Sequence, residues 1–361
     1  MSFRFLGNKS KLLPHITEAV TEVVPPTGRP QVLDPFSGTG SVSLALAKIG
    51  YRMVSSDLLL SCVTHTQAQL LAEAPLRFED LFARASLPER PAPNLFSEST
   101  PYHKVLAYLN GLPGEKGFFY REYSKEGEPA NGVEPRNYFA PQNARKIDAI
   151  RSQIAEWGEA EVLKMEERAA LLHDLMLATN QVANTAGTYG YFLSSLTKSA
   201  RQPLRLRPTS FSSGPADHQV IQGDAEEVAS SFTADVAYLD PPYNKRQYAA
   251  YYHVLETLAH EDTPELIGKS GLRPWQENAS DYCYKARASD ALASLLQSVD
   301  ARYIFISYSE DGHIPHEQMM DLLSERGAVE HLEMNYARYR SNDGGDSADS
   351  LKERLYKVET S

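Results

Sequence analysis

Apolar residues near the start of the chain form a short run, then a helical pattern, then a second run. Residues 32–34 predict a buried strand, and apolar positions within 42–49 recur at the i, i+3, i+4 and i+7 spacing of one helical face. Gly50 stands where that helix would end, and residues 52–56 predict a second strand with Asp57 at its end. This segment therefore predicts a βαβ unit.

A second block, from residue 218 to residue 358, alternates in the same way. Apolar runs predict strands at 218–221, 236–239 and 302–308, with a closing pair at 329–336 and 354–358. Helical patterns lie between them at 225–230, 252–260 and 317–326. Together the two blocks predict an α/β fold with a doubly wound, mostly parallel, seven-stranded, Rossmann-like sheet.

The region between the two blocks, residues 60–213, has a different character. Prolines and glycines are dense from Pro88 to Pro141, and two helical patterns follow at 143–157 and 161–182. A connection of this length is far beyond the usual few residues within an α/β sheet. We therefore expect a discontinuous sheet domain, 1–59 and 214–361, that carries an inserted, largely helical recognition domain.

Composition limits the class of protein without identifying it. The 361 residues are 42% hydrophobic and 23% charged, which are values of a globular chain. No run approaches the roughly 18 apolar residues of a membrane span, and the first residues lack the pattern of a signal peptide. The two cysteines, Cys62 and Cys283, are too few for a disulfide framework or a zinc cluster. We expect a cytoplasmic protein with no membrane partner and no metal.

Net charge argues against one class of partner. The formal charge is −11, whereas proteins that grip phosphates usually carry a basic surplus. A local basic face still acts within a Debye length of about 8 Å, whatever the distant surface carries. The net charge therefore makes a nucleic-acid partner less expected, but it does not exclude one.

The glycine turn after the first strand predicts a cofactor loop. Gly38 and Gly40 bring backbone N–H groups and a helix start to the carboxyl edge of the sheet, where such folds bind cofactors. Asp57 stands where a carboxylate accepts both ribose hydroxyls. A dinucleotide loop needs a third glycine, and that position is Ser43, which makes nicotinamide a minor alternative. Asp34 suits the α-amino group of S-adenosylmethionine; the alternative is a tight turn without a ligand.

The tetrad Asp240-Pro241-Pro242-Tyr243 follows the most apolar strand. Two successive prolines remove backbone donors and make a rigid corner. If Asp240 and the Pro241 carbonyl accept hydrogen bonds from the N–H groups of an exocyclic amine, its lone pair is freed for methylation, and Tyr243 can stack on a base that has left the helix. A strand-ending proline turn is the alternative, which the glycine loop makes less attractive.

With these residues quoted, the chain resembles the adenine-N6 DNA methyltransferases of the Dam-like D12 family. Residues 5–13 resemble its motif X, the glycine loop its motif I, Gly223-Asp224 its adenine-contacting stretch, and Asp240 to Tyr243 its motif IV. Residues 340–345 and 353–356 are similar to its closing motif. The resemblance implies these cofactor-binding residues: Phe5, Gly7, Lys9, Asp34, Phe36, Ser37, Gly38, Thr39, Gly40, Asp57 and Asp224.

Two of these assignments have plain alternatives. Lys9 and Lys11 can equally be solvated lysines at a helix start, and Asp224 can serve only to cap the helix at 225–230. The order of motifs X, I, insertion and IV is the family's alpha arrangement, with target recognition in the insertion. The insertion itself, with 137–139 and 183–190, looks more like that of restriction-associated adenine methylases than that of Dam.

Basic residues at two places are candidates for DNA contacts. Arg205 and Arg207 alternate with Leu204 and Leu206, so an extended segment would present guanidinium groups on one face and pack the other. A solvated edge is the alternative. The full candidate set is Lys198, Arg201, Arg205, Arg207, Lys245 and Arg246.

The resemblance implies a site-specific enzyme that methylates adenine N6 in double-stranded DNA, with the base flipped into the Asp-Pro-Pro-Tyr pocket. S-adenosylmethionine is the implied cofactor and S-adenosylhomocysteine the product, and a cognate restriction endonuclease is a further partner that this family allows. The alternatives are an RNA adenine or guanine methyltransferase, and a catalytically silent DNA-binding subunit. No residue of either motif is missing, which disfavours the silent subunit.

Overall fold

The computed structural model describes residues 7, 9–72, 75–85, 100–211, 217–337 and 350–361. Its contacts divide the chain into two compact units, which are described separately. The sheet unit contains Leu6–Thr66, Gly214–Tyr248 and Asn278–Ser361, and the helical unit contains Gln67–Ser213 and Ala249–Glu277. The segment Ala249–Glu277 thus packs with the inserted region, although the strand and helix pattern had grouped it with the sheet.

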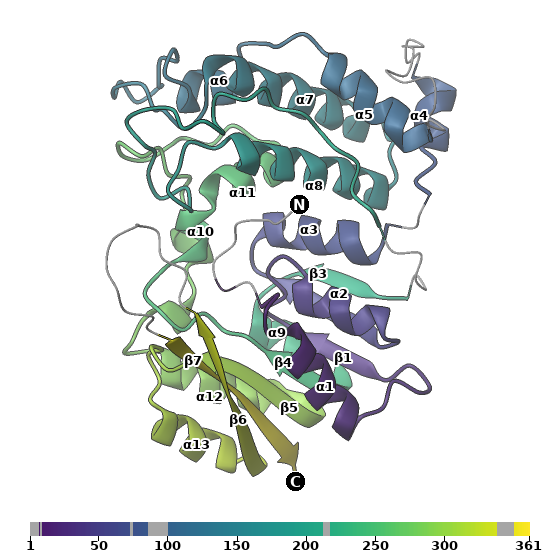
Figure 1. Ribbon diagram of the computed structural model, residues 1–361, viewed down its shortest axis with the longest axis vertical. Coiled ribbons are helices and arrows are strands. Elements are labelled where there is room, and N and C mark those ends of the chain that lie inside the picture. Colours follow the sequence, from purple (N-terminus) through teal and green to yellow (C-terminus); the bar gives the residue numbers. More distant parts are fainter. Residues whose placement is uncertain (1–6, 8, 73–74, 86–99, 212–216, 338–349) are drawn as a thin grey trace. The chain divides into compact units, whose positions relative to one another are not determined.

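The sheet unit is built on seven strands in the order β3-β2-β1-β4-β5-β7-β6 (Figure 1). Strands β1 to β5 pair in parallel, and β7 runs antiparallel to both of its neighbours. Their bounds are β1 Gln31–Asp34, β2 Arg52–Asp57, β3 Gln219–Gln222, β4 Thr233–Leu239, β5 Asp300–Ser309, β6 Gly327–Ala337 and β7 Ser350–Thr360. The predicted α/β fold with a mostly parallel, seven-stranded sheet is confirmed.

Helices cover both faces of this sheet. On one face α9 (Ala225–Ser230), α12 (Ala288–Ser298) and α13 (His316–Ser324) share a core cluster with inward residues of the strands, including Leu33 and Ile304. On the other, α1 (Leu13–Val23) and α2 (Ser41–Lys48) pack against each other (Figure 1). Burial of each large apolar side chain contributes about 1.5–3 kcal/mol, so the two layers of helices stabilise the sheet that lies between them.

The helix after the glycine loop is one residue shorter than its apolar pattern suggests. α2 ends at Lys48, Ile49 is 42% exposed, and Gly50 adopts a φ of +113°. The chain turns away at a backbone geometry that favours glycine, so Ile49 faces solvent although it continues the helical period. No sequence pattern predicted α1 or α12.

The helical unit is organised around two long helices. These are α7 (Pro141–Glu159) and α8 (Met165–Val182), near the two predicted helices. α8 begins at Met165 rather than at residue 161, because Glu161 takes a φ of +53° and the Val162 N–H bonds to the Trp157 carbonyl. The shorter helices are α4 (Glu79–Arg84), α5 (Pro101–Gly111), α6 (Phe118–Tyr123) and α11 (His253–His260); α3 (Leu60–Leu70) and α10 (Tyr248–Tyr251) stand at the boundary between the units.

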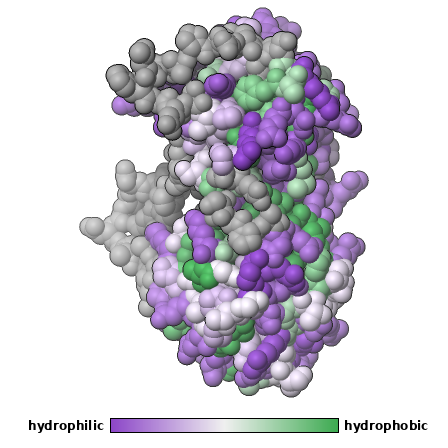
Figure 2. Space-filling model, turned by 90° about the vertical axis from the view of Figure 1, so that its right-hand side faces the viewer, coloured by the Kyte–Doolittle hydropathy of each residue, from purple (hydrophilic) through white to green (hydrophobic). Residues whose placement is uncertain are grey.

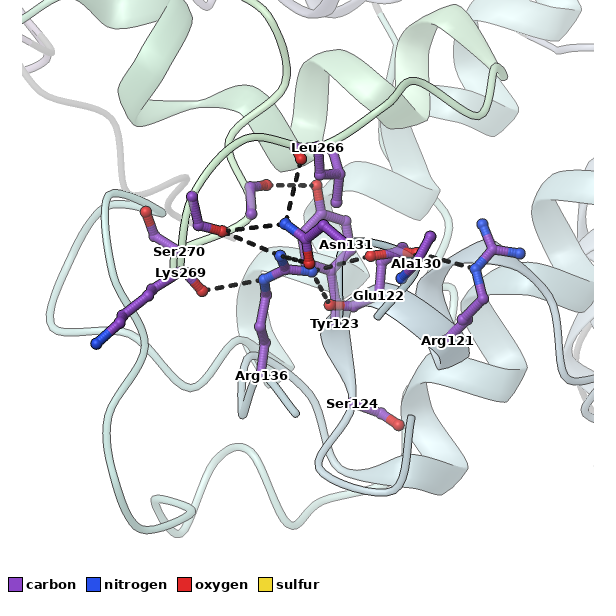
Figure 3. A network of polar contacts seen from close by, with 12 residues as sticks. Arg121, Glu122, Tyr123, Ser124, Ala130, Asn131, Arg136, Leu266, Lys269 and Ser270 are labelled. Atoms are coloured by element: carbon purple, nitrogen blue, oxygen red, sulfur yellow. Dashed lines mark hydrogen bonds and ion pairs between the residues drawn. The ribbon is translucent and has the colours of Figure 1, made fainter. Parts of the chain in front are cut away.

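A buried arginine joins the Ala249–Glu277 segment to the inserted region (Figure 3). The Arg136 side chain is fully buried and donates to Glu122 Oε2 at 2.9 Å. It also donates to the carbonyls of Lys269 at 3.0 Å and Gly268 at 3.1 Å, and to Asn131 Oδ1 at 3.1 Å. A buried charge is tolerated when it is paired and hydrogen-bonded, as here, so this network fixes the fold of the helical unit.

On the face that Figure 2 shows, hydrophobic residues form small groups separated by hydrophilic ones. Within the described part of the chain, no helix combines the length and apolar character needed to cross a membrane. Among the same residues, no cluster of three or more His, Cys, Asp or Glu side chains could hold a metal ion. Cys62 and Cys283 are both buried free thiols.

Candidate active site

The loop between β1 and α2 depends on glycine. Gly38 has a φ of +53° and Gly40 a φ of +77°, both in the left-handed region. A Cβ atom at Gly40 would lie 2.9 Å from Thr66 Oγ1, too close for any other residue without a shift. The Gly40 N–H donates to the Ser37 carbonyl at 2.8 Å and closes the turn, with Thr39 between the two glycines. The loop therefore has the tight geometry that the sequence predicts.

Asp34 is buried at the end of β1, and one of its two carboxylate oxygens accepts no hydrogen bond from the described residues. The Ser43 hydroxyl donates to Asp34 Oδ2, and the Ser55 hydroxyl donates to Ser43 Oγ at 2.8 Å. Asp34 Oδ1 is buried and makes no hydrogen bond within the described part of the chain. Burial raises the pKa of Asp34 to about 7, against the hydrogen bond from Ser43, which lowers it. A buried oxygen without a donor is suited to an N–H group of a ligand.

Asp57, at the end of β2, braces the same loop. Its Oδ2 accepts a hydrogen bond from the Gly38 N–H at 3.0 Å and its Oδ1 accepts one from the Leu59 N–H at 2.9 Å. The carboxylate is only half-buried, and each of its oxygens carries a second lone pair. Asp57 therefore holds the glycine turn in place.

Asp224 has the capping role that was its alternative assignment. Its Oδ1 accepts from the Glu226 N–H at 2.8 Å at the start of α9. Nearby, the ring of Phe36 meets the ring of Tyr282 edge-on, with centroids 5.2 Å apart. Burial, with the charge of Asp224 as a smaller cause, raises the pKa of Tyr282. Tyr282 lies in the short helix η2 (Asp281–Cys283) and was not among the predicted site residues.

Three charged side chains meet where β4 ends. Lys9 Nζ lies 3.0 Å from Asp240 Oδ1 and forms a second ion pair with Glu353 Oε1 on β7. The Ser307 hydroxyl, on β5, donates to Glu353 Oε1 at 2.8 Å. Lys9 is 5% exposed and Glu353 is fully buried, whereas Asp240 remains 17% exposed. The solvated alternative thus holds for Lys11, which is exposed, but is wrong for Lys9.

The electrostatics of this group are set by burial and by its ion pairs. Burial raises the pKa of Asp240 to about 6; the charge of Lys9 lowers it and that of Glu353 raises it. Burial alone would lower the pKa of Lys9, but the two carboxylates outweigh it and the pKa is raised well above its usual value. Lys9 therefore stays charged, and Asp240 is ionised at neutral pH.

The rest of the tetrad forms the predicted corner. Pro241 is buried and Pro242 is half-buried, and neither has a backbone donor. The Tyr243 carbonyl accepts from the His313 N–H at 2.9 Å. The Lys9 ammonium lies 5.6 Å from the centroid of the half-buried Tyr243 ring, so that ring carries a cation contact in addition to its exposed surface.

The structure describes only part of the predicted motif X and closing motif. Gly7 has a φ of +75°, and a Cβ atom there would lie 3.1 Å from the Tyr248 hydroxyl, so glycine is favoured. Phe5 and residues 340–345 lie outside the described residues. The sheet unit therefore brings together Lys9, Asp34, Asp240 and Tyr243, all at the carboxyl edges of β1 and β4 or beside them.

The candidate DNA contacts are exposed, at two places. Lys198, Arg201, Arg205 and Arg207 lie on the helical unit, and Lys245 and Arg246 follow the corner in the sheet unit. Leu204 and Leu206 are each 4% exposed, so the predicted alternation is present. The segment is extended but is not a strand.

Two asparagine side chains hydrogen-bond to the backbone of this extended segment, as a neighbouring strand would in a sheet. Leu204 N–H donates to Asn143 Oδ1 at 2.9 Å, and Leu206 N–H donates to Asn110 Oδ1 at 2.8 Å. The amide of Asn110 in turn donates to the Leu206 carbonyl at 2.9 Å. Both leucine N–H groups and the Leu206 carbonyl are thus bonded without a neighbouring strand, and the side chains of Arg205 and Arg207 are exposed.

Comparison with known proteins places the chain in a family. Residues 5–322 match the model of the D12 class N6 adenine-specific DNA methyltransferases. The chain is 37% identical over 239 residues to the type II methyltransferase M.NlaIII of Neisseria lactamica, covering 66% of this chain and 70% of that protein. It is 32% identical to the type II methyltransferase M.FokI of Planomicrobium okeanokoites, covering 99% of this chain and 52% of that protein.

A third relative shows the same pattern of coverage. The chain is 31% identical to the modification methylase StsI of Streptococcus sanguinis, over 94% of this chain and 49% of that protein. The chain thus spans about half the length of two of these relatives. The family model covers most of the chain, including the glycine loop and the Asp-Pro-Pro-Tyr corner. The chain belongs to the D12 class of N6 adenine-specific DNA methyltransferases.

Proposed function

We propose that this protein transfers a methyl group from S-adenosylmethionine to N6 of adenine at specific sites in double-stranded DNA. One observation carries the proposal: Asp34 and Asp240 stand at the carboxyl ends of β1 and β4, which pair directly in the sheet. Residues far apart in the sequence thus present two carboxyl groups at one edge. That edge is where open α/β sheets bind ligands.

The cofactor side of the proposal rests on the glycine loop. The unpaired Asp34 Oδ1 fits the α-amino group of S-adenosylmethionine, and Asp57 fits the ribose hydroxyls. The loop residues Phe36, Ser37, Gly38, Thr39 and Gly40 would line the cofactor, with Phe36 and Tyr282 as aromatic neighbours. The bound cofactor supplies an electrophilic methyl group and leaves as S-adenosylhomocysteine.

The base side of the proposal rests on the corner. An adenine amino group is a poor nucleophile because its lone pair is delocalised into the ring. Asp240 and the Pro241 carbonyl would accept hydrogen bonds from its two N–H groups, so that the lone pair turns toward the methyl group. The ring of Tyr243 would stack on the flipped base and offset part of the unstacking cost of a few kcal/mol. The proton is lost after transfer, and Asp240 stabilises the positive charge until then.

In this proposal the inserted region binds the DNA. Residues 60–213 would recognise the target sequence, with the exposed arginines of the extended segment, Arg205 and Arg207, on the phosphates. The names of the relatives, type II methyltransferases and a modification methylase, support a role beside a cognate restriction endonuclease. Protection of the methylated DNA from that nuclease would be the corresponding activity.

The test is a transfer assay with methyl-labelled S-adenosylmethionine on unmethylated DNA and, in parallel, on RNA. We expect label on DNA with the wild-type chain and none with Asp240→Ala. Asp290→Ala, an exposed aspartate on α12, is the matched control and should retain activity. Label on RNA alone would show that RNA is the substrate instead of DNA. Label on neither polymer, by a protein that still binds S-adenosylmethionine, would favour a catalytically silent subunit.

A further inference from the structure

The ion pairs of Lys9 are not explained by a role in cofactor binding. The Lys9 ammonium is directed at two carboxylates, Asp240 at 3.0 Å and Glu353, both within the sheet unit. Removing three charged groups from water is costly, and such a cluster persists only when its geometry satisfies most of its members. Nothing in the proposed methyl transfer uses Glu353, although it is fully buried beside the catalytic corner.

The strand register explains how these groups meet on one face of the sheet. Tyr238 on β4 pairs with Phe305 on β5, so Asp240, two residues further on, comes level with Ser307. On the other side of β5, Ser309 pairs with Glu353 of β7. Because side chains on a strand alternate between faces, Asp240, Ser307 and Glu353 all point the same way. Lys9, from the segment before α1, lies on this face.

We propose that Lys9 and Glu353 are positioning residues for Asp240: Glu353, fixed by Ser307, anchors the Lys9 ammonium, which in turn holds Oδ1 of Asp240. The other carboxylate oxygen, Oδ2, is then the one presented to the amino group of the target base. This inference rests on the proposed catalytic role of Asp240 and adds a reason for the buried acid on the last strand.

Charge supports the same assignment. Among the described residues, the titratable groups that interact with Asp240 are Lys9, Glu353, Asp34 and Tyr238, and Lys9 is the cation among these four. Without its charge, Asp240 would be buried near two other acids and would take up a proton near neutral pH. A protonated Asp240 has lost the charge that stabilises the methylated amine. Lys9 therefore sets both the orientation and the ionisation of the carboxylate.

The experiment compares the pH dependence of kcat in four variants. Lys9→Met should lower kcat at least about tenfold at pH 7.5 and move the acid limb of the profile upward by about one pH unit or more. Glu353→Gln keeps an acceptor for Lys9 and Ser307 but removes a negative charge, so its acid limb should move downward. Lys9→Arg should restore part of the activity, and Lys11→Met, at an exposed lysine, should match the wild type.

A purely structural role would reduce the amount of folded protein without moving these limbs in opposite directions. A Lys9→Met enzyme with the wild-type acid limb would overturn the proposal. A second readout does not require activity: the carboxyl carbon-13 titration of Asp240, assigned with Asp240→Asn, should shift upward in Lys9→Met. If wild-type chain fails to methylate DNA, the proposed function fails, while this titration still decides whether Lys9 controls Asp240.

Discussion

Ser43 stands where a dinucleotide-binding loop carries its third glycine, and its hydroxyl donates a hydrogen bond to Asp34. The same hydroxyl accepts from Ser55, so the residue that breaks the glycine pattern orients a buried carboxylate. In the proposed function, that carboxylate receives the amino group of the cofactor. The departure from the dinucleotide pattern is therefore a positive feature of the site.

Replacing Ser43 with alanine should weaken cofactor binding. The variant loses a hydrogen bond that lowers the pKa of Asp34, so less of the carboxylate is ionised near pH 7. A hydrogen bond to a charged group contributes about 1.5–3 kcal/mol, so the Kd for S-adenosylmethionine should rise about tenfold or more. Isothermal titration calorimetry measures it. An unchanged Kd in a folded variant would remove Asp34 from the cofactor site.

Cofactor binding by the wild-type chain should depend on pH around neutrality. The pKa of Asp34 is raised to about 7, so the carboxyl group is largely protonated at pH 6 and largely ionised at pH 8. Only the ionised form attracts a positively charged amino group, so the Kd should fall as pH rises through 7. Asp34→Asn should bind more weakly and lose this dependence. An equally steep dependence in Asp34→Asn would assign the titration to another group.

Replacing Arg205 and Arg207 with alanine should weaken DNA binding and flatten its dependence on salt. Each phosphate contact contributes about 0.9 to the slope of log K against log salt, so the slope should fall by one to two contacts. Both side chains are exposed, so folding should be preserved. Fluorescence anisotropy at several salt concentrations gives the slope. The same slope in the double variant would place the phosphate contacts elsewhere.

The helical unit should be sensitive to the loss of one buried carboxylate. Glu122→Ala leaves Arg136 buried without its ion-pair partner, which should cost about 3–5 kcal/mol of unfolding free energy. Glu126→Ala removes an acid that is 61% exposed and pairs with Arg145, and it should cost less than about 1 kcal/mol. Urea denaturation compares the two. Similar losses would mean that the Arg136 network does not stabilise the fold.

Local sequence patterns were sufficient to predict most of the sheet. The apolar run before Asp34, the glycines of the loop and the prolines after Asp240 are short-range signals, and each marks the end of a strand in the structure. The pairing of β6 with β7 confirms the closing pair of strands. What the pattern could not give was the exact end of α2, because backbone geometry at Gly50 overrides the period that includes Ile49.

Contacts between residues far apart in the chain could not be predicted from the sequence. Glu353 lies in a segment quoted only for its family resemblance, and nothing local marks it as the partner of Lys9. Only the strand register could have identified Glu353, because it places this residue opposite Ser309, on the face that carries Asp240. Tyr282 was missed for a similar reason, since its contact with Phe36 depends on where η2 packs. Asp224, by contrast, has the local capping role that its position before α9 predicts.

The identity of the methylated nucleoside tests the proposed function most directly. DNA is incubated with the wild-type chain and S-adenosylmethionine carrying a deuterated methyl group, digested, and analysed by mass spectrometry, with Asp240→Ala beside it. We expect deuterated N6-methyldeoxyadenosine with the wild-type chain and none with the variant. Deuterium in a cytosine nucleoside, or equal labelling of adenine by Asp240→Ala, would contradict the proposed function.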